Sequence, residues 1–132
     1  MSVESGSVEE GSLQEPLFER GEVVWVDLAN LPIAKSEMGK FRPAVNVQWE
    51  VANEEDNPNV TIVPFTTKDG LEGSDTHIKI GRGEGGITEE CYALCDNITT
   101  VSKTRVKHRI GHLSTEKMNI IYEAISIHLD IL

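Results

Sequence analysis

The chain has 132 residues, of which 39% are hydrophobic and 26% are charged, and these values fit one globular domain with its own core. No apolar run is long enough to cross a membrane, no secretory leader is visible, and two cysteines cannot build a disulfide framework, so we expect a cytoplasmic protein. The net charge of −10 argues against a protein that coats nucleic acid through bulk electrostatics, but it allows a local basic site for one anionic ligand.

The N-terminal segment is acidic. Residues 1–18 are rich in Ser, Glu and Gly and contain no lysine or arginine. Their low hydrophobicity predicts a disordered tail, followed by one folded domain over residues 19–132. A solvated tail is one interpretation. The other is an acidic arm that folds over the basic site, with Leu17 and Phe18 covering Arg42.

Short β-rich segments occupy most of the domain. Bulky apolar and β-branched residues, bounded by turn residues, predict strands over 21–28, 43–49, 60–67, 76–80, 91–95 and 107–111. Segment 98–101 either continues the strand 91–95 or makes the next one. Pro43 is tolerated as the first residue of its strand, and Pro64 predicts an edge or a bulge near the end of the third strand. Many short strands of this kind predict a mainly β fold, a small barrel or sandwich.

One helix is predicted at the C-terminal end of the chain. Ser114 or Thr115 with the early Glu116 is a typical helix start. Apolar residues then recur at helical spacing, which predicts one face that packs on the barrel. These residues are Met118, Ile121, Tyr122, Ile125 and Leu129.

Several other motifs have ordinary structural explanations. The glycine-rich run 81–86 lacks the lysine and the helix start of a phosphate loop and predicts a tight turn with positive backbone dihedrals. Cys91 and Cys95 are predicted to be small core residues, and the four histidines are scattered. We therefore expect neither a metal site nor a cofactor.

Arg42 and Thr66 are the most specific candidate site. Arg42 follows a charged loop, 33–41, at the start of a predicted strand, and Thr66 lies near the end of another. An arginine can hold a phosphate with two hydrogen bonds, and a threonine hydroxyl can contact a ribose or phosphate oxygen. Such a pair could support attack of a ribose 2′-OH on the adjacent phosphorus. The alternative is a surface ion-pair partner and an ordinary strand residue.

Segments that occur in the same order resemble the MazF/PemK family of toxin endoribonucleases. They are 20–28, 42–44, 63–67, 76–78, 98–105 and 110–114. The resemblance implies an SH3-like β-barrel with a C-terminal helix, a homodimer, and metal-independent, sequence-specific cleavage of single-stranded RNA. It also implies a cognate antitoxin that binds this protein. Any contact with DNA would then be indirect, through the antitoxin.

The resemblance also implies roles for individual residues. The catalytic arginine of the family falls on Arg42 and the catalytic threonine on Thr66, with Thr67 as the alternative. The loop 33–41 and the segment 103–105 match regions that contact RNA in the family. We expect an RNA-binding set of Lys35, Lys40, Thr67, Lys68, His77, Lys103 and Arg105.

Several features depart from the family pattern, and one alternative function stays open. The family usually lacks an acidic 18-residue tail and is less acidic overall. Asn46 interrupts the aliphatic run of its strand, and segment 50–59 is strongly acidic. The alternative is a non-catalytic or gyrase-binding toxin on the same barrel. Gyrase-binding toxins of the CcdB type end in Trp-Gly-Ile, whereas this chain ends in Asp130-Ile131-Leu132, so we expect the endoribonuclease.

Overall fold

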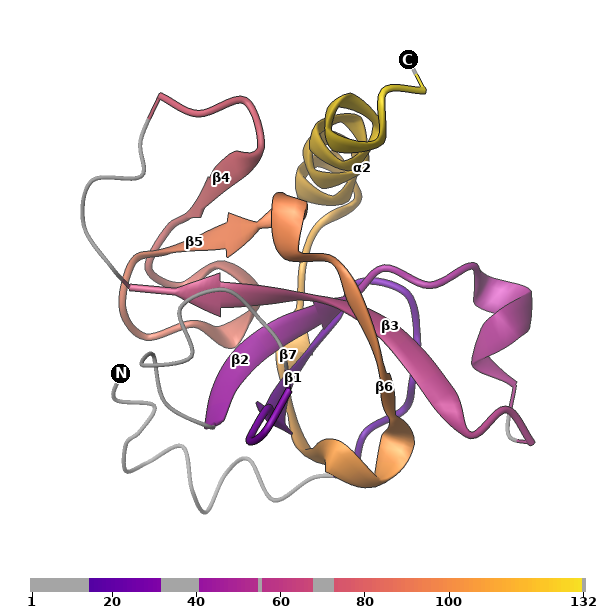
Figure 1. The fold of residues 1–132 in the computed structure, drawn as a ribbon. Helices are drawn as coiled ribbons and strands as arrows, with labels where there is room; N and C mark the ends of the chain where they lie inside the picture. Colours follow the sequence, from indigo (N-terminus) through magenta and orange to yellow (C-terminus); the bar gives the residue numbers. More distant parts are fainter. Residues whose placement is uncertain (1–14, 32–40, 55, 68–72, 132) are drawn as a thin grey trace.

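The computed structural model describes residues 15–31, 41–54, 56–67 and 73–131. Lys35, Lys40, Lys68 and most of the acidic tail lie outside these residues. The strands are β1 (Glu22–Asp27), β2 (Phe41–Asn46), β3 (Asn59–Thr66), β4 (His77–Ile80), β5 (Cys91–Leu94), β6 (Thr99–Ser102) and β7 (Val106–His112). Helix α2 (Thr115–Leu129) follows them. The described residues also form the short 3-10 helices η3 (Glu50–Asn53), η4 (Glu84–Gly86), η5 (Cys95–Asn97) and η6 (Lys103–Arg105). The predicted mainly β fold with a C-terminal helix is confirmed (Figure 1).

The strands form one antiparallel sheet in the order β4-β5-β3-β2-β1-β7, and β6 pairs with β3 as well. Strand β3 is its centre, because it pairs with β2 on one side and with both β6 and β5 on the other. Pro64 was predicted to mark an edge or a bulge, but β3 lies inside the sheet. Pro64 lies between the β6 pairing, which ends at Ile62, and the β5 pairing, which starts at Phe65. The missing N–H is therefore placed where β3 changes partners.

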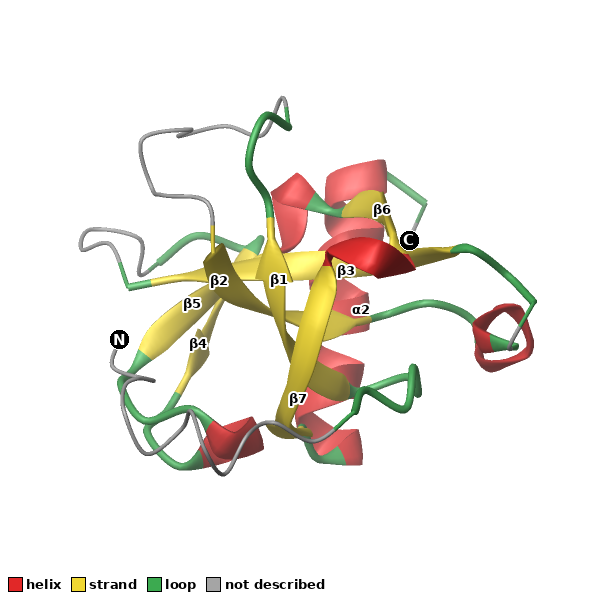
Figure 2. Ribbon diagram, turned by 90° about the horizontal axis from the view of Figure 1, so that it is seen from below, coloured by secondary structure: helices red, strands yellow, loops and turns green. Residues whose placement is uncertain are grey.

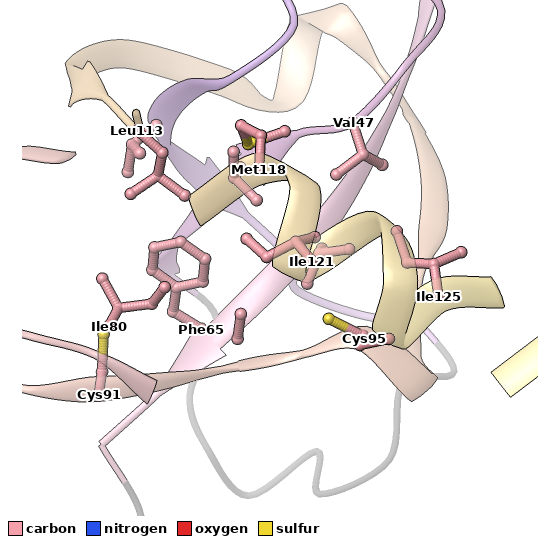
Figure 3. Close-up of a cluster of buried hydrophobic side chains, with 14 of the residues drawn as sticks. Val47, Phe65, Ile80, Cys91, Cys95, Leu113, Met118, Ile121 and Ile125 are labelled. Atoms are coloured by element: carbon pink, nitrogen blue, oxygen red, sulfur yellow. The ribbon is translucent and has the colours of Figure 1, made fainter. Parts of the chain in front are cut away.

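Helix α2 covers one face of the sheet and closes the larger core cluster. Its N-cap is Ser114, whose hydroxyl accepts a hydrogen bond from the Lys117 N–H, as predicted. Met118, Ile121 and Ile125 are buried on this face, and Figure 3 shows them on α2 in the same cluster as Phe65, Ile80 and Cys95. Figure 2 shows α2 more faintly, farther from the viewer than β1, β2 and β7. The predicted stripe is wrong at its end, since Leu129 is exposed and Ala124 is buried in its place.

A second buried cluster lies on the other face of the sheet. Neighbouring residues along a strand go to different clusters, as the two-residue period of a strand requires. On β2, for example, Ala44 belongs to the second cluster and Val45 to the first. The second cluster consists of Val24, Val26, Leu28, Ala44, Val60, Ile62, Val101 and Val106, with Phe18 and Leu31 packed against it.

The buried carboxylate of Glu22 ties the N-terminal segment to this sheet. It accepts hydrogen bonds from the N–H groups of Leu17 and Phe18, each at 2.6 Å, and lies 3.8 Å from the Arg109 guanidinium. Leu17 and Phe18, at the end of the predicted tail, are thus hydrogen-bonded to the folded domain. Phe18 packs against the second cluster, with the Lys103 ammonium 4.7 Å from the centre of its ring.

Asn46, the departure from the aliphatic pattern, anchors the acidic excursion between β2 and β3. Its buried amide donates to Asn53 Oδ1 at 2.9 Å and accepts from the Gln48 N–H at 2.8 Å. Gln48 Nε2 in turn donates to the carbonyl of Ala52. The polar residue is thus satisfied inside the sheet and fixes η3 against it.

The glycine-rich run forms the predicted tight turn. Gly83, Gly85 and Gly86 all have positive φ. A Cβ built on Gly86 would lie 2.4 Å from the carbonyl oxygen of Ile110, so only glycine lets this turn approach β7. In the part of the chain that the structure describes, no helix has the length and apolar character needed to cross a bilayer.

Candidate active site

The sheet brings Arg42 and Thr66 together. Strand β2 pairs with β3 through Ala44 and Pro64, and extending this antiparallel register by two residues places Arg42 opposite Thr66. Directly opposed residues of neighbouring strands have side chains on the same face, about 5 Å apart. That face is the one that carries the second cluster, because Val26, the partner of Arg42 on β1, belongs to that cluster.

Arg42 is a buried cation beside the end of β3. Only 8% of the residue is exposed, and its Nη1 donates to the carbonyl oxygen of Phe65 at 3.0 Å, next to Thr66 in the chain. Burial lowers the pKa of Arg42 from its ordinary value, but an arginine keeps its charge at any working pH. The burial of Arg42 contradicts the alternative interpretation of this arginine as a surface residue.

The structure distinguishes the two candidate threonines. Thr66 is 6% exposed and is the last residue of β3. Thr67 is exposed and follows the strand. Because strand residues alternate between faces, Thr66 shares the face of Arg42 and its neighbour does not. The geometry favours Thr66.

Two predicted RNA-binding residues make contacts within the chain. Lys103 follows β6, and its backbone N–H donates to the carbonyl of Pro58, next to the start of β3 at Asn59. Thr66 is at the other end of β3, seven residues from Asn59, which is about 23 Å along a strand. Lys103 therefore lies at the opposite end of β3 from Thr66. Its Nζ donates to the carbonyl of Glu54. Arg105 Nη1 donates to the carbonyls of Asp27 and Ala29 at 3.1 and 3.0 Å, so this side chain fixes the backbone that leaves β1.

His77 lies at the start of β4 and is held by an acid. Its Nε2 is 3.1 Å from Asp96 Oδ2. Its other ring nitrogen, Nδ1, is buried without a hydrogen-bond partner among the described residues. His77 lies two residues before Lys79 on β4. Lys79 pairs with Tyr92 of β5, and Tyr92 pairs with Thr66 of β3. By the two-residue period of a strand, His77 therefore shares the face of Thr66 and Arg42.

An aromatic group that the sequence analysis missed lies on the opposite face. The rings of Trp25 and Phe41 stack at 6.3 Å, as do those of Trp25 and His108. Burial lowers the pKa of His108. Phe41 lies on β2, Trp25 on β1 and His108 on β7, and the pairing of these three strands brings the rings together. Only the alternating patterns of all three strands, taken together, could have indicated this aromatic group.

The two cysteines are buried and free, which confirms them as core residues. Burial, with Glu89 and Glu90 nearby, raises the pKa of Cys91 to about 12, and burial also raises the pKa of Cys95 to about 12. Among the described residues no three His, Cys, Asp or Glu side chains come together as a metal site would require.

Comparison with known proteins gives consistent matches. The family described as PemK-like, MazF-like toxin of type II toxin-antitoxin system matches residues 19–129. Endoribonuclease MazF of Staphylococcus saprophyticus is 30% identical over 113 residues, which cover 86% of this chain and 92% of that protein. Endoribonuclease EndoA of Bacillus subtilis is 29% identical over 113 residues, with 86% and 95% covered.

Solved structures have the same fold. An endoribonuclease from a mycobacterial species, in complex with its cognate antitoxin, has a TM-score of 0.69 at 24% identity, with 86% of this chain and 96% of that chain covered. A MazE–MazF structure from Deinococcus radiodurans has a TM-score of 0.66 at 14% identity, with 86% and 96% covered. At these identities the structures establish the fold alone.

Proposed function

Since the chain belongs to the PemK-like, MazF-like family of type II toxin–antitoxin toxins, we propose that it is an endoribonuclease that cleaves single-stranded RNA at a phosphate held by Arg42 and Thr66. The observation that carries this proposal is the position of Arg42. It is a buried arginine opposite a buried threonine, at the ends of two central strands. Burial of a cation is costly, so a site of this kind is typical of anion recognition.

The chemistry follows from the two side chains. The ribose 2′-oxygen forms a bond to the adjacent phosphorus, and the bond from phosphorus to the 5′-oxygen breaks. The proton that the 2′-OH loses is balanced by the one that the 5′-oxygen gains, so the products are a cyclic 2′,3′-phosphate and a 5′-hydroxyl. The nucleophile comes from the substrate, so the reaction requires no metal ion.

Arg42 stabilises the extra negative charge of the pentacoordinate phosphorus. In a site from which water is largely excluded, a fixed cation acts more strongly than it does in water. The hydrogen bond from Arg42 Nη1 to the Phe65 carbonyl holds the guanidinium beside Thr66. The hydroxyl of Thr66 orients a ribose or phosphate oxygen of the RNA.

The proposed partners follow from the family. A type II toxin is controlled by an antitoxin, and a mycobacterial relative of the same fold was solved with its cognate antitoxin. We propose that this chain binds an antitoxin of its own, meets DNA only through it, and forms a homodimer. Light scattering of the purified protein tests the dimer.

A substrate with one altered position tests the reaction. The purified protein is incubated in EDTA with an RNA that it cuts and with the same RNA carrying a 2′-deoxy sugar at the scissile nucleotide. The first should be cut to a 5′-hydroxyl product and the second should stay intact. Equal cleavage of the deoxy substrate would exclude attack by the 2′-OH, and no cleavage of any RNA would leave a binding toxin.

A further inference from the structure

Arg42 on β2 and Thr66 on β3 are the first two members of a row of side chains that continues across β5 and β4, with Tyr92 and Lys79 as the next two. Thr66 on β3 pairs directly with Tyr92 on β5, and Tyr92 pairs directly with Lys79 on β4. Neighbouring strands lie about 4.8 Å apart. Tyr92 is therefore one strand spacing from Thr66, and Lys79 is two, in a line across the sheet.

All members of this row lie on one face. The residues that alternate with them, Phe65 on β3, Ala93 on β5 and Ile80 on β4, belong to the core cluster beneath α2. Figure 3 shows Phe65 and Ile80 on that side. By the two-residue period of a strand, Thr66, Tyr92 and Lys79 lie on the face that does not carry the helix. Tyr92 is half-buried there and Lys79 is exposed.

We infer that Tyr92 is a specificity-determining residue of this site: its ring stacks on the base of a nucleotide next to the scissile phosphate, and Lys79 contacts the phosphate beyond. This inference rests on the proposed function. Unpaired bases are bound by stacking on aromatic side chains, and the flanking phosphates are bound by cations. Arg42, Thr66, Tyr92 and Lys79 present these groups in the order cation, hydroxyl, aromatic ring, cation.

The Lys79 end of the row carries its own counter-ion. Its Nζ lies 2.9 Å from a carboxylate oxygen of Glu90, and both side chains are more than half exposed. An ion pair in water is weak, so a phosphate can take the place of the carboxylate. Glu90 is then a competitor of RNA, and its removal should strengthen binding.

The test uses variants of Tyr92 and two separate readouts. Tyr92→Leu keeps apolar volume without the aromatic ring, and Tyr92→Phe keeps the ring. With a cleavable RNA, Tyr92→Leu should raise KM about 10- to 100-fold, the effect of losing one base–aromatic stack, and should relax the base preference at one position beside the cut. Tyr92→Phe should keep both the KM and the preference of the wild type.

The second readout is the Kd for the same RNA with a 2′-deoxy sugar at the scissile nucleotide, measured by fluorescence anisotropy. Tyr92→Leu and Lys79→Gln should weaken binding, whereas Glu90→Gln should tighten it. A Tyr92→Leu variant with the wild-type Kd, KM and base preference would overturn the inference. A wild type that binds through Tyr92 but cuts nothing would refute the proposed reaction alone, and a wild type that binds no RNA would refute both.

Discussion

The glycine-rich turn gives the sharpest prediction about the fold. Gly86 has a φ of +82°, and a Cβ placed there would meet the backbone carbonyl of Ile110 at 2.4 Å. Gly83, in the same turn, has a φ of +94°, but a Cβ placed there would have no neighbour within 4 Å. Alanine at either position carries the cost of a positive φ, and only alanine at Gly86 also displaces β7.

The magnitudes follow from these two terms. An L-residue at positive φ costs about 1–2 kcal/mol, and overpacking adds about 1–3 kcal/mol. Gly83→Ala should therefore lower the free energy of unfolding by about 1–2 kcal/mol and Gly86→Ala by about 2–5 kcal/mol. Urea unfolding at one fixed protein concentration measures both values. Equal losses in the two variants would show that the turn does not approach β7 closely.

Two further predictions concern buried polar groups. Glu22→Gln should lower the free energy of unfolding by about 1–3 kcal/mol, because the buried carboxylate that accepts two short hydrogen bonds from backbone N–H groups is lost. As a control, Glu123→Gln at an exposed position should change the free energy of unfolding by less than about 0.5 kcal/mol. Equal effects of the two substitutions would refute the role of Glu22. Burial raises the pKa of Cys91 and of Cys95 to about 12, so at pH 8 both thiols stay protonated. They should react slowly with a disulfide reagent in the native protein and rapidly in urea. A fast reaction in the native protein would contradict their burial.

Local patterns in the sequence predicted most of the fold. Each strand was found because its period and β-branched residues are local signals, and the helix start was found because Ser114 and its cap are consecutive in the chain. Boundaries shifted where a distant partner decides them. Strand β2 begins at Phe41, before the predicted Pro43, because Phe41 pairs with Asp27 of β1.

The candidate site was predicted in part. Arg42 and Thr66 were identified by resemblance, and the register of β2 and β3 supports their pairing. Tyr92 was missed, because nothing near it in the sequence connects it with Thr66. The resemblance implies that Lys103 and Arg105 contact RNA. In the structure they donate hydrogen bonds to the backbone carbonyls of Glu54 and Asp27, which are far away in the chain, and no local sequence signal could predict these contacts.

The central claim is that Arg42 drives cleavage at a phosphate. The most direct test sequences the 5′-ends of fragments that wild type, Arg42→Ala and Arg82→Ala produce from a mixed single-stranded RNA in EDTA. Arg82 is an exposed arginine of the glycine-rich turn and serves as the matched control. Wild type and Arg82→Ala should give the same set of new 5′-hydroxyl ends, and folded Arg42→Ala should give almost none. Undiminished cleavage at the same sites by Arg42→Ala would contradict the account.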